Sequence, residues 1–208
     1  MTARSGLSTL IARWRDMVAD TGTVGFTDDE AQTILDSYRV DLYRHEMGAI
    51  AVNIGGTVNY LTHLVGYGDL ETVASGSAFF QVWDVNGSAI GTADYTADYQ
   101  RGILTFTANQ MGSARYLDGR SFDLYGAAAH GWREWAGAKA SLYRFSADGA
   151  SYDRQQWWEH CMAMAAYYDT LATTGASTLS VGYMQRGDVN VLNTSWFGWS
   201  DNATVDRD

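Results

Sequence analysis

Hydrophobic positions in the second half of the chain recur at the spacing of two long helices that fold back on each other. The spacing predicts one helix over residues 122–145 and another over residues 152–174, each roughly 35 Å long at 1.5 Å per residue. The loop between them carries the turn signal Asp148-Gly149, and Gly175 is expected to end the second helix. So short a loop makes the helices antiparallel neighbours. The two stripes are Tyr125, Ala128, Ala129, Trp132, Ala136, Ala140 and Tyr143, and Trp157, Cys161, Met164, Ala165, Tyr168, Leu171 and Ala172.

Two shorter helices are predicted near the N-terminus. The second follows Thr27, an N-cap that forms a capping box with Glu30, and it is expected to end near residues 40–45. Acidic residues also suit the positive end of a helix dipole, so capping accounts for the cluster at 28–30 without a bound cation. The first helix spans residues 5–20, and its apolar face consists of Leu7, Leu10, Ile11, Trp14 and Val18.

From about residue 47 the pattern changes to the alternation typical of strands. Gly55-Gly56 predicts one hairpin turn, and Asn86-Gly87 predicts a type I′ turn with positive φ at both residues. Asp118-Gly119 is expected to close the region just before the long helices. The predicted strands are residues 48–54, 57–65, 79–85, 88–95 and 103–107.

The pattern as a whole predicts an α+β fold that is mainly an α-helical bundle with an inserted antiparallel β domain. Residues 1–46 and 119–175 form the discontinuous bundle, in which two N-terminal helices accompany the long helical hairpin. Residues 47–118 form the β insertion domain. Residues 176–208 lack clear periodicity and are expected to form an extended C-terminal arm.

Composition and charge exclude several classes of function. The net charge of −10 argues against a surface that binds nucleic acid by neutralising phosphates, although DNA can still slide past such a surface. Cys161 is the only cysteine, so an intrachain disulfide framework and a cysteine zinc cluster are excluded, and a buried thiol is expected. No apolar run approaches the roughly 20 residues of a membrane span, and Arg13 and Arg15 interrupt any secretory signal.

A search for catalytic residues finds no convincing constellation. His130 and Glu134 lie four residues apart on one predicted helix, and Glu159 adjoins His160 on the next. Adjacent helical side chains diverge by about 100°, and the repeated Glu-x-x-His pattern of dimetal bundles is missing, so solvated polar faces explain these residues better. Nucleophile-elbow, phosphate-loop and dinucleotide motifs are also missing. The protein is therefore expected to be no enzyme and to need no cofactor or metal.

The aromatic residues suggest contacts with other molecules. Trp157 and Trp158 are adjacent and cannot both face one narrow core stripe, so we expect them at an interface between subunits. Trp196, Phe197 and Trp199 form an apolar cluster in a polar tail, which either docks on a partner or folds back on its own chain. Aromatics of the predicted insert leave a glycan-binding module as an alternative function; they are Tyr60, Tyr67, Trp83, Tyr95, Tyr99 and Tyr116.

Four segments also share their order and spacing with a known family. They are residues 10–16 with 26–36, residues 99–106, residues 123–132 and residues 145–154. Together they resemble the small head–tail connector, or adaptor, proteins of tailed bacteriophages. The stretch 145–154, which leads into the last helix, is the most telling, and the C-terminal arm lies outside the resemblance.

The resemblance implies a structural virion protein at the head–tail junction, assembled in the host cytoplasm and without a membrane partner. Such proteins are helical bundles that form a homo-oligomeric ring, usually a dodecamer, beneath the portal protein, and viral DNA passes through the lumen without specific binding. They present a surface to the tail or to a stopper protein of the neck. By analogy the arm with Trp196, Phe197 and Trp199 is the expected portal-docking element. Another neck or tail-completion protein is the alternative, and stoppers are expected to be rich in strands.

Overall fold

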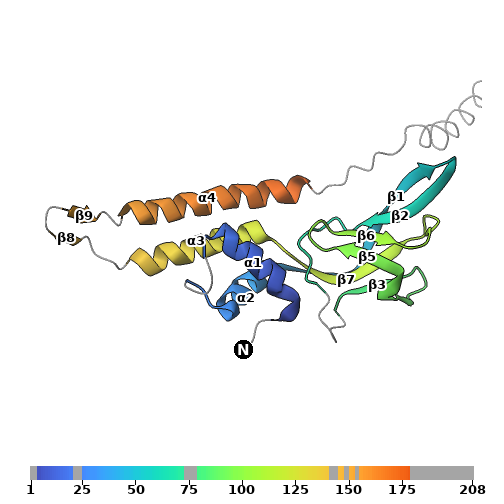
Figure 1. The fold of residues 1–208 in the computed structure, drawn as a ribbon, viewed down its shortest axis with the longest axis horizontal. Coiled ribbons are helices and arrows are strands. Elements are labelled where there is room, and N and C mark those ends of the chain that lie inside the picture. The colour runs from blue at the N-terminus through green and yellow to red at the C-terminus, as the bar shows by residue number, and fades with distance from the viewer. Residues whose placement is uncertain are drawn as a thin grey trace, which may run out of the picture.

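The computed structural model describes residues 4–20, 25–72, 79–140, 145–147, 150–152 and 155–178 (Figure 1). Its helical elements are η1 (Ser5–Leu7), α1 (Ser8–Met17), α2 (Asp28–Ser37), η2 (Thr92–Asp94), α3 (Leu124–Ala140) and α4 (Gln155–Thr178). Its strands are β1 (Arg39–Ile54), β2 (Thr57–Leu64), β3 (Gln81–Trp83), β4 (Ala89–Ile90), β5 (Tyr95–Asp98), β6 (Ile103–Phe106), β7 (Arg115–Phe122), β8 (Phe145–Ala147) and β9 (Ala150–Tyr152). The first seven strands form one antiparallel sheet in the order β4-β3-β7-β1-β2-β6-β5, and β8 pairs with β9.

The long strand β1 is the centre of the sheet. Its first half, up to Met47, pairs with β7, and its second half, from Gly48 onward, pairs with β2. Strand β1 thereby joins β4-β3-β7 on one edge to β2-β6-β5 on the other, and the seven strands form a half-barrel sheet. Buried side chains from the two halves form one core, which comprises Leu42, Met47, Val65, Leu70, Phe80, Val82, Tyr95, Leu104, Phe106 and Leu117.

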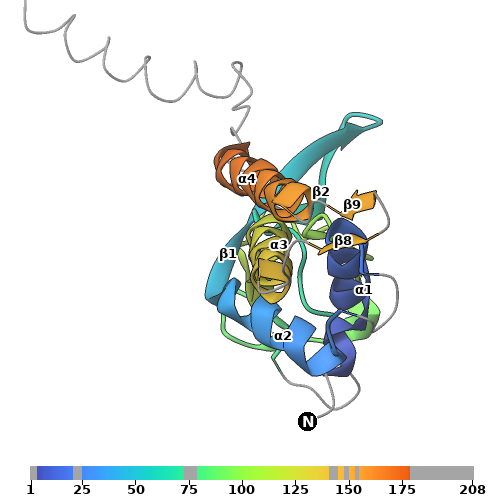
Figure 2. The ribbon, with the colours of Figure 1, turned by 90° about the vertical axis from the view of Figure 1, so that its left-hand side faces the viewer.

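The helices form layers at one end of the sheet. Figures 1 and 2 show α1 and α2 on one side of α3 and α4 on the other side. The apolar face predicted for the first helix is confirmed, because all five of its residues are buried. The capping box is confirmed as well: Thr27 Oγ1 accepts from the backbone N of Glu30, and Glu30 Oε2 accepts from the backbone N of Thr27 at 2.7 Å.

The predicted fold class is wrong. The protein is a seven-stranded antiparallel half-barrel sheet with four α-helices in the described ranges, and it is not a mainly helical bundle that carries a β insert. The second helix ends at Ser37, and β1 begins at Arg39, where helix was expected. The expected boundaries after residues 46 and 118 fall inside β1 and β7, which pair with each other.

A bulge explains why the start of β1 was mistaken for helix. The register between β1 and β7 shifts between Leu42 and His45, and the extra residue on β1 brings Arg44 to a φ of 48°. The bulge interrupts strict alternation, so that Leu42 and Met47 are both buried although they lie five positions apart. Strand pairing over such a distance along the chain leaves no trace in local periodicity.

The turn signal Asp118-Gly119 was also misinterpreted, because both residues lie inside β7. The Asp118 carboxylate accepts a hydrogen bond from the backbone N of Arg44 at 2.6 Å and another from Trp83 Nε1 at 2.7 Å. Asp118 is therefore a cross-strand acceptor that serves two neighbouring strands. Its polarity reflects that role and not a turn.

Two further local predictions differ from the structure. The hairpin around Gly55-Gly56 is confirmed, whereas Asn86-Gly87 is not a type I′ turn, because only Gly87 has a positive φ, at 79°. The Asp84 carboxylate holds that loop by accepting from the backbone N of Asn86 and of Ser88. Helix α4 also continues through Gly175, since one glycine costs a helix only about 1 kcal/mol.

Candidate subunit interface

Helix α3 starts at a well-defined cap and carries small residues where other elements approach. Asp123 Oδ1 accepts hydrogen bonds from the backbone N of Tyr125 at 3.1 Å and of Gly126 at 3.0 Å. A methyl group on Gly131 would lie 2.7 Å from Trp14 and 2.8 Å from Val18, so only glycine permits α1 to come this close. The sequence therefore commits one side of α3 to α1 and α2 and leaves another side for α4.

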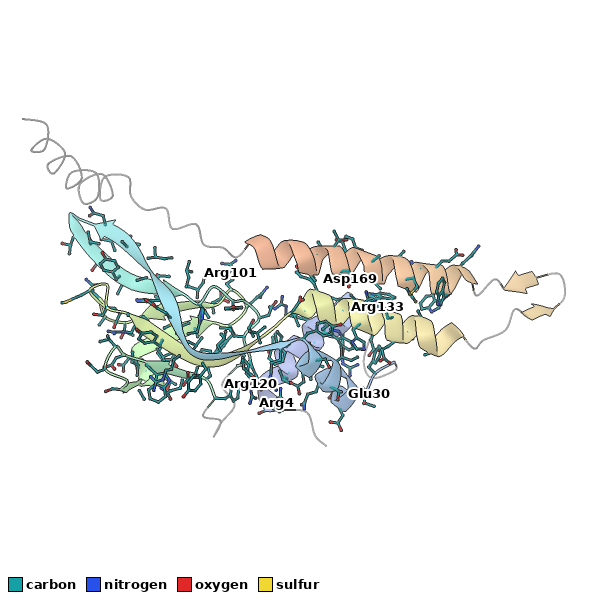
Figure 3. The ribbon with its side chains drawn as sticks, turned by 180° about the vertical axis from the view of Figure 1, so that it is seen from behind. Arg4, Glu30, Arg101, Arg120, Arg133 and Asp169 are labelled. Atoms are coloured by element: carbon teal, nitrogen blue, oxygen red, sulfur yellow. The ribbon has the colours of Figure 1, made fainter. Side chains whose placement is uncertain are left out.

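Helix α4 packs on α3 through a narrow stripe. Cys161 and Ala165 are buried there, and Met164 and Tyr168 are partly buried against the same core. Cys161 is buried, which confirms the expected buried thiol, and burial raises the pKa of this thiol. An ion pair between Arg133 of α3 and Asp169 of α4 joins the two helices at their surface (Figure 3).

The rest of α4 faces away from the molecule and is largely apolar. Trp158 is 43% exposed and Tyr167 is 55% exposed. Helix α4 contains no lysine or arginine, and its only acids are Glu159 and Asp169. We call its exposed apolar residues the α4 outer face: Trp158, Met162, Ala163, Ala166 and Tyr167.

The structure places the two predicted interface tryptophans of α4 differently. Trp157 turns toward α3, where its ring centroid lies 6.5 Å from that of Trp135, and it also lies 6.0 Å from the ring of His160 on its own helix. Trp158 lies on the α4 outer face. Both side chains remain more than two-fifths exposed, so the described part of the chain covers each of them only in part. The other predicted residues, Trp196, Phe197 and Trp199, lie outside the described residues, as do Asp148-Gly149 and the arm from residue 179 onward.

Sequence reasoning missed Met162 and Tyr167 as candidate interface residues. Both lie off the buried stripe, and both are exposed. The signal that was available is the near absence of charge between Gln155 and Thr178, since a helix with one solvent-facing side normally carries charges on that side.

A second exposed apolar surface, which carries no charge, lies at the far end of β1 and β2, which project together from the sheet (Figure 1). We call residues 50–58 the β1–β2 ribbon. Each of these residues is exposed, and Ile54 at its end is 57% exposed. Strand β7 pairs with β1 only as far as Met47, and β6 pairs with β2 only from Thr62 onward, so no third strand supports the ribbon among the described residues. The sequence has no Asp, Glu, Lys or Arg between Met47 and Gly68.

A pocket of about 440 Å³ opens between α2 and α3. Phe26, Ile34 and Trp135 contribute aromatic and apolar side chains to it, whereas Glu30 and Glu134 make its lining acidic. The pocket faces away from the α4 outer face, because Glu30 lies on the side of the molecule opposite α4 (Figure 3). Nothing in its lining combines a nucleophile with a base.

The histidines considered as metal ligands or acid–base groups have separate surroundings. His130 pairs with Glu134 at 3.3 Å and lies at the edge of the Tyr38 ring, whereas His160 packs against Trp132. Within the described ranges, no group of three or more metal-binding side chains comes together.

The aromatics considered for glycan binding do not form one platform. Tyr95 is buried against Phe106, and Tyr99 packs against Phe80 in the core of the half-barrel. Trp83 lies beneath the guanidinium of Arg44, whose central carbon is 3.7 Å from the ring centroid. The six residues therefore serve several different packing contacts.

Comparison of the chain with protein-family models, with curated proteins and with solved structures found no match. None of the helices in the described part of the chain is both long enough and apolar enough to cross a membrane.

Proposed function

We propose that this chain is a structural protein of a tailed-phage virion, a head–tail adaptor that assembles into a ring beneath the portal. The ring extends the DNA channel and presents a docking surface to the tail or to the next neck protein. The proposal starts from the four-segment resemblance, and the α4 outer face is the structural observation that supports it.

The α4 outer face supports assembly because its apolar side chains are unfavourable in contact with water. Trp158, Met162 and Tyr167 lie on one long helix with few charges between them, and aromatic residues and methionine are the side chains enriched in protein interfaces. Glu159 is the one exposed acid among these residues. Apolar side chains that gather on one exposed helix face often mark a surface that a partner covers.

The charge distribution is also compatible with the proposed role. The chain carries a net charge of −10, so copies repel one another and associate best through neutral surfaces. DNA phosphates are repelled as well, which suits a lumen through which DNA passes without binding.

Electron microscopy of the protein alone and mixed with its portal tests the proposal. We expect rings that stack on the portal and that are lost in the variant Trp158→Glu, because a carboxylate on the α4 outer face is costly to bury. Val85→Glu is the matched control, since Val85 is exposed and lies in the β3–β4 connection. A chain that stays monomeric and ignores the portal would exclude the adaptor.

The half-barrel sheet favours a second candidate, a stopper or tail-completion protein of the same neck, because strand-rich folds are expected for stoppers. The two candidates differ in their partner. An adaptor binds the isolated portal directly, whereas a stopper requires an adaptor already on the portal. Mixing the chain with the portal alone and then with assembled neck complexes separates them.

A further inference from the structure

We propose that the β1–β2 ribbon of one copy lies against the α4 outer face of the next copy around the ring. This inference rests on the proposed function, since it requires a ring of identical copies. It names the two surfaces that meet at each subunit interface.

Both surfaces carry little charge. In a chain of net charge −10, the ribbon contains no charged residue, and α4 contains only Glu159, which is exposed, and Asp169, which is paired with Arg133. These two surfaces therefore allow a second copy to approach with little repulsion. A nucleic-acid partner has no cation to contact on either surface.

The ribbon is also exposed along both of its strands. The ribbon presents Ile50, Val52, Ile54 and Val58 to solvent from only two strands, and a two-stranded hairpin is marginally stable unless something covers it. An uncharged strand with an unpaired edge also invites non-specific pairing. A neighbour's helix covers such a ribbon without extending the sheet indefinitely.

The ribbon and α4 lie on the same side of the molecule, away from α1 and α2, and Figure 2 shows that the ribbon projects past α4 to one side. The ribbon therefore does not fold onto its own α4, and a second copy can reach both surfaces from that side. Two different patches on one subunit form a head-to-tail contact, which closes into a ring when the rotation permits.

Disulfide trapping tests the contact. The double variants Val52→Cys with Ala166→Cys, and Ile54→Cys with Ala163→Cys, place one thiol on each surface, and the native Cys161 is buried. We expect oxidation of at least one double variant to give a ladder of covalent oligomers, while each single variant stays uncrosslinked.

Other crosslinking patterns would overturn the proposal. Crosslinking of Val52→Cys alone would show that ribbons pair with ribbons. A disulfide confined to monomers would place the ribbon on its own α4. Rings that form in every double variant without any ladder would show that other surfaces join the subunits, and the proposed function would then stand without this inference.

A charge exchange provides a second, independent measurement. Val52→Glu should reduce the population of rings at least tenfold, and Ala166→Lys should restore them in the Val52→Glu background. Val85→Glu makes the same change at an exposed position away from both surfaces and should leave ring formation unchanged. Equal ring populations in wild type and Val52→Glu would overturn the proposal. Failure of wild type to form rings at all would instead exclude the proposed function.

Discussion

Arg4 and Asp36 form a two-pronged ion pair, in which Arg4 Nη1 donates to Oδ2 at 2.9 Å and Nη2 donates to Oδ1 at 2.6 Å. Arg4 Nε also donates at 3.0 Å to Glu71, whose side chain is only 1% exposed. The bond to Asp36 is the main reason that the pKa of Arg4 is raised. These residues belong to a closed ring of charges, in which each ion pair shares a residue with the next and which joins residue 4, α2 and the sheet. From Glu71 the ion pairs lead back to Asp36 through Arg120, Asp41 and Arg39.

Replacing Arg4 should destabilise the fold. In Arg4→Ala the buried Glu71 keeps, among the described residues, Arg120 as its ionic partner at 3.5 Å, and Asp36 loses its two-pronged contact. We expect a loss of about 2 kcal/mol in the free energy of unfolding, below the cost of breaking a fully buried pair because Arg4 is partly exposed. Urea denaturation measures this difference.

Arg101→Ala is the matched control for that measurement. Arg101 is largely exposed and lies 3.9 Å from Asp98, so its removal should change the free energy of unfolding by less than about 0.5 kcal/mol. Equal effects of the two substitutions would mean that the ring of charges contributes no more than a surface ion pair.

Two glycines on α3 predict opposite outcomes for the same substitution. A methyl group on Gly131 would meet Trp14 at 2.7 Å, whereas a methyl group on Gly137 would meet no atom within 4 Å. Alanine favours a helix by about 1 kcal/mol over glycine, so Gly137→Ala should stabilise the protein by up to that amount. In Gly131→Ala overpacking should outweigh this gain and cost a net ~1–2 kcal/mol.

Thermal denaturation of both variants measures the contrast. If Gly131→Ala stabilised the protein, α1 would be able to move away from α3 without a loss of stability. A destabilising Gly137→Ala would mean that this end of α3 is covered in solution, for example by a second copy of the chain.

The sequence predicted those elements whose signals are local. The capping box at Thr27, the buried face of α1 and the β1–β2 hairpin all depend on residues within a few positions of one another, and all three are confirmed. The fold class was wrong because it depends on the pairing of Arg39 with Phe122, which lie far apart in sequence. A bulge at Arg44 also broke the alternation that identifies a strand.

The candidate interface was only partly predictable for a similar reason. The adjacency of Trp157 and Trp158 indicated that one of them must leave the core, and Trp158 does lie on the outer side of α4. The ribbon was recognised as a hairpin, but its exposure was not, because periodicity does not show whether a third strand covers a hairpin. Only the strand pairing shows that β7 does not reach the ribbon along β1 and that β6 does not reach it along β2.

His63 should make stability depend on pH. Burial is the main cause of the lowered pKa of His63, and the positive charge of Arg115 lowers that pKa further. The nearby backbone of Ser113 and Leu61 forms no hydrogen bond of normal geometry with the ring nitrogens. The unfolded chain therefore binds a proton more readily than the folded chain. The contribution of neutral His63 to the free energy of unfolding is complete above the ordinary histidine pKa of about 6.5. It is lost as the pH falls from there toward the lowered pKa of His63.

The variant His63→Leu isolates this effect. At pH 8 its free energy of unfolding should be within about 1 kcal/mol of wild type, because a neutral buried ring is replaced by an apolar side chain of similar size. Between pH 7 and pH 5 the variant should lose less stability than wild type. Identical pH profiles would show that His63 remains neutral, or becomes accessible, without any cost to the fold.

Removal of the C-terminal aromatics should separate portal binding from self-assembly. Trp196, Phe197 and Trp199 are side chains of the kind that dominate binding energy at interfaces, and in the sequence they come after both surfaces proposed to join the subunits. Deletion of residues 193–208 should therefore abolish stacking on the portal while rings still form. Deletion of residues 201–208 is the control, since it removes acidic residues but keeps all three aromatics, and portal binding should persist.

Because the contact between the arm and the portal is expected to be apolar, moderate salt should weaken it little. Portal binding that survives the longer deletion would move the portal contact to the helices or the sheet, and rings that vanish with it would make the arm part of the subunit interface.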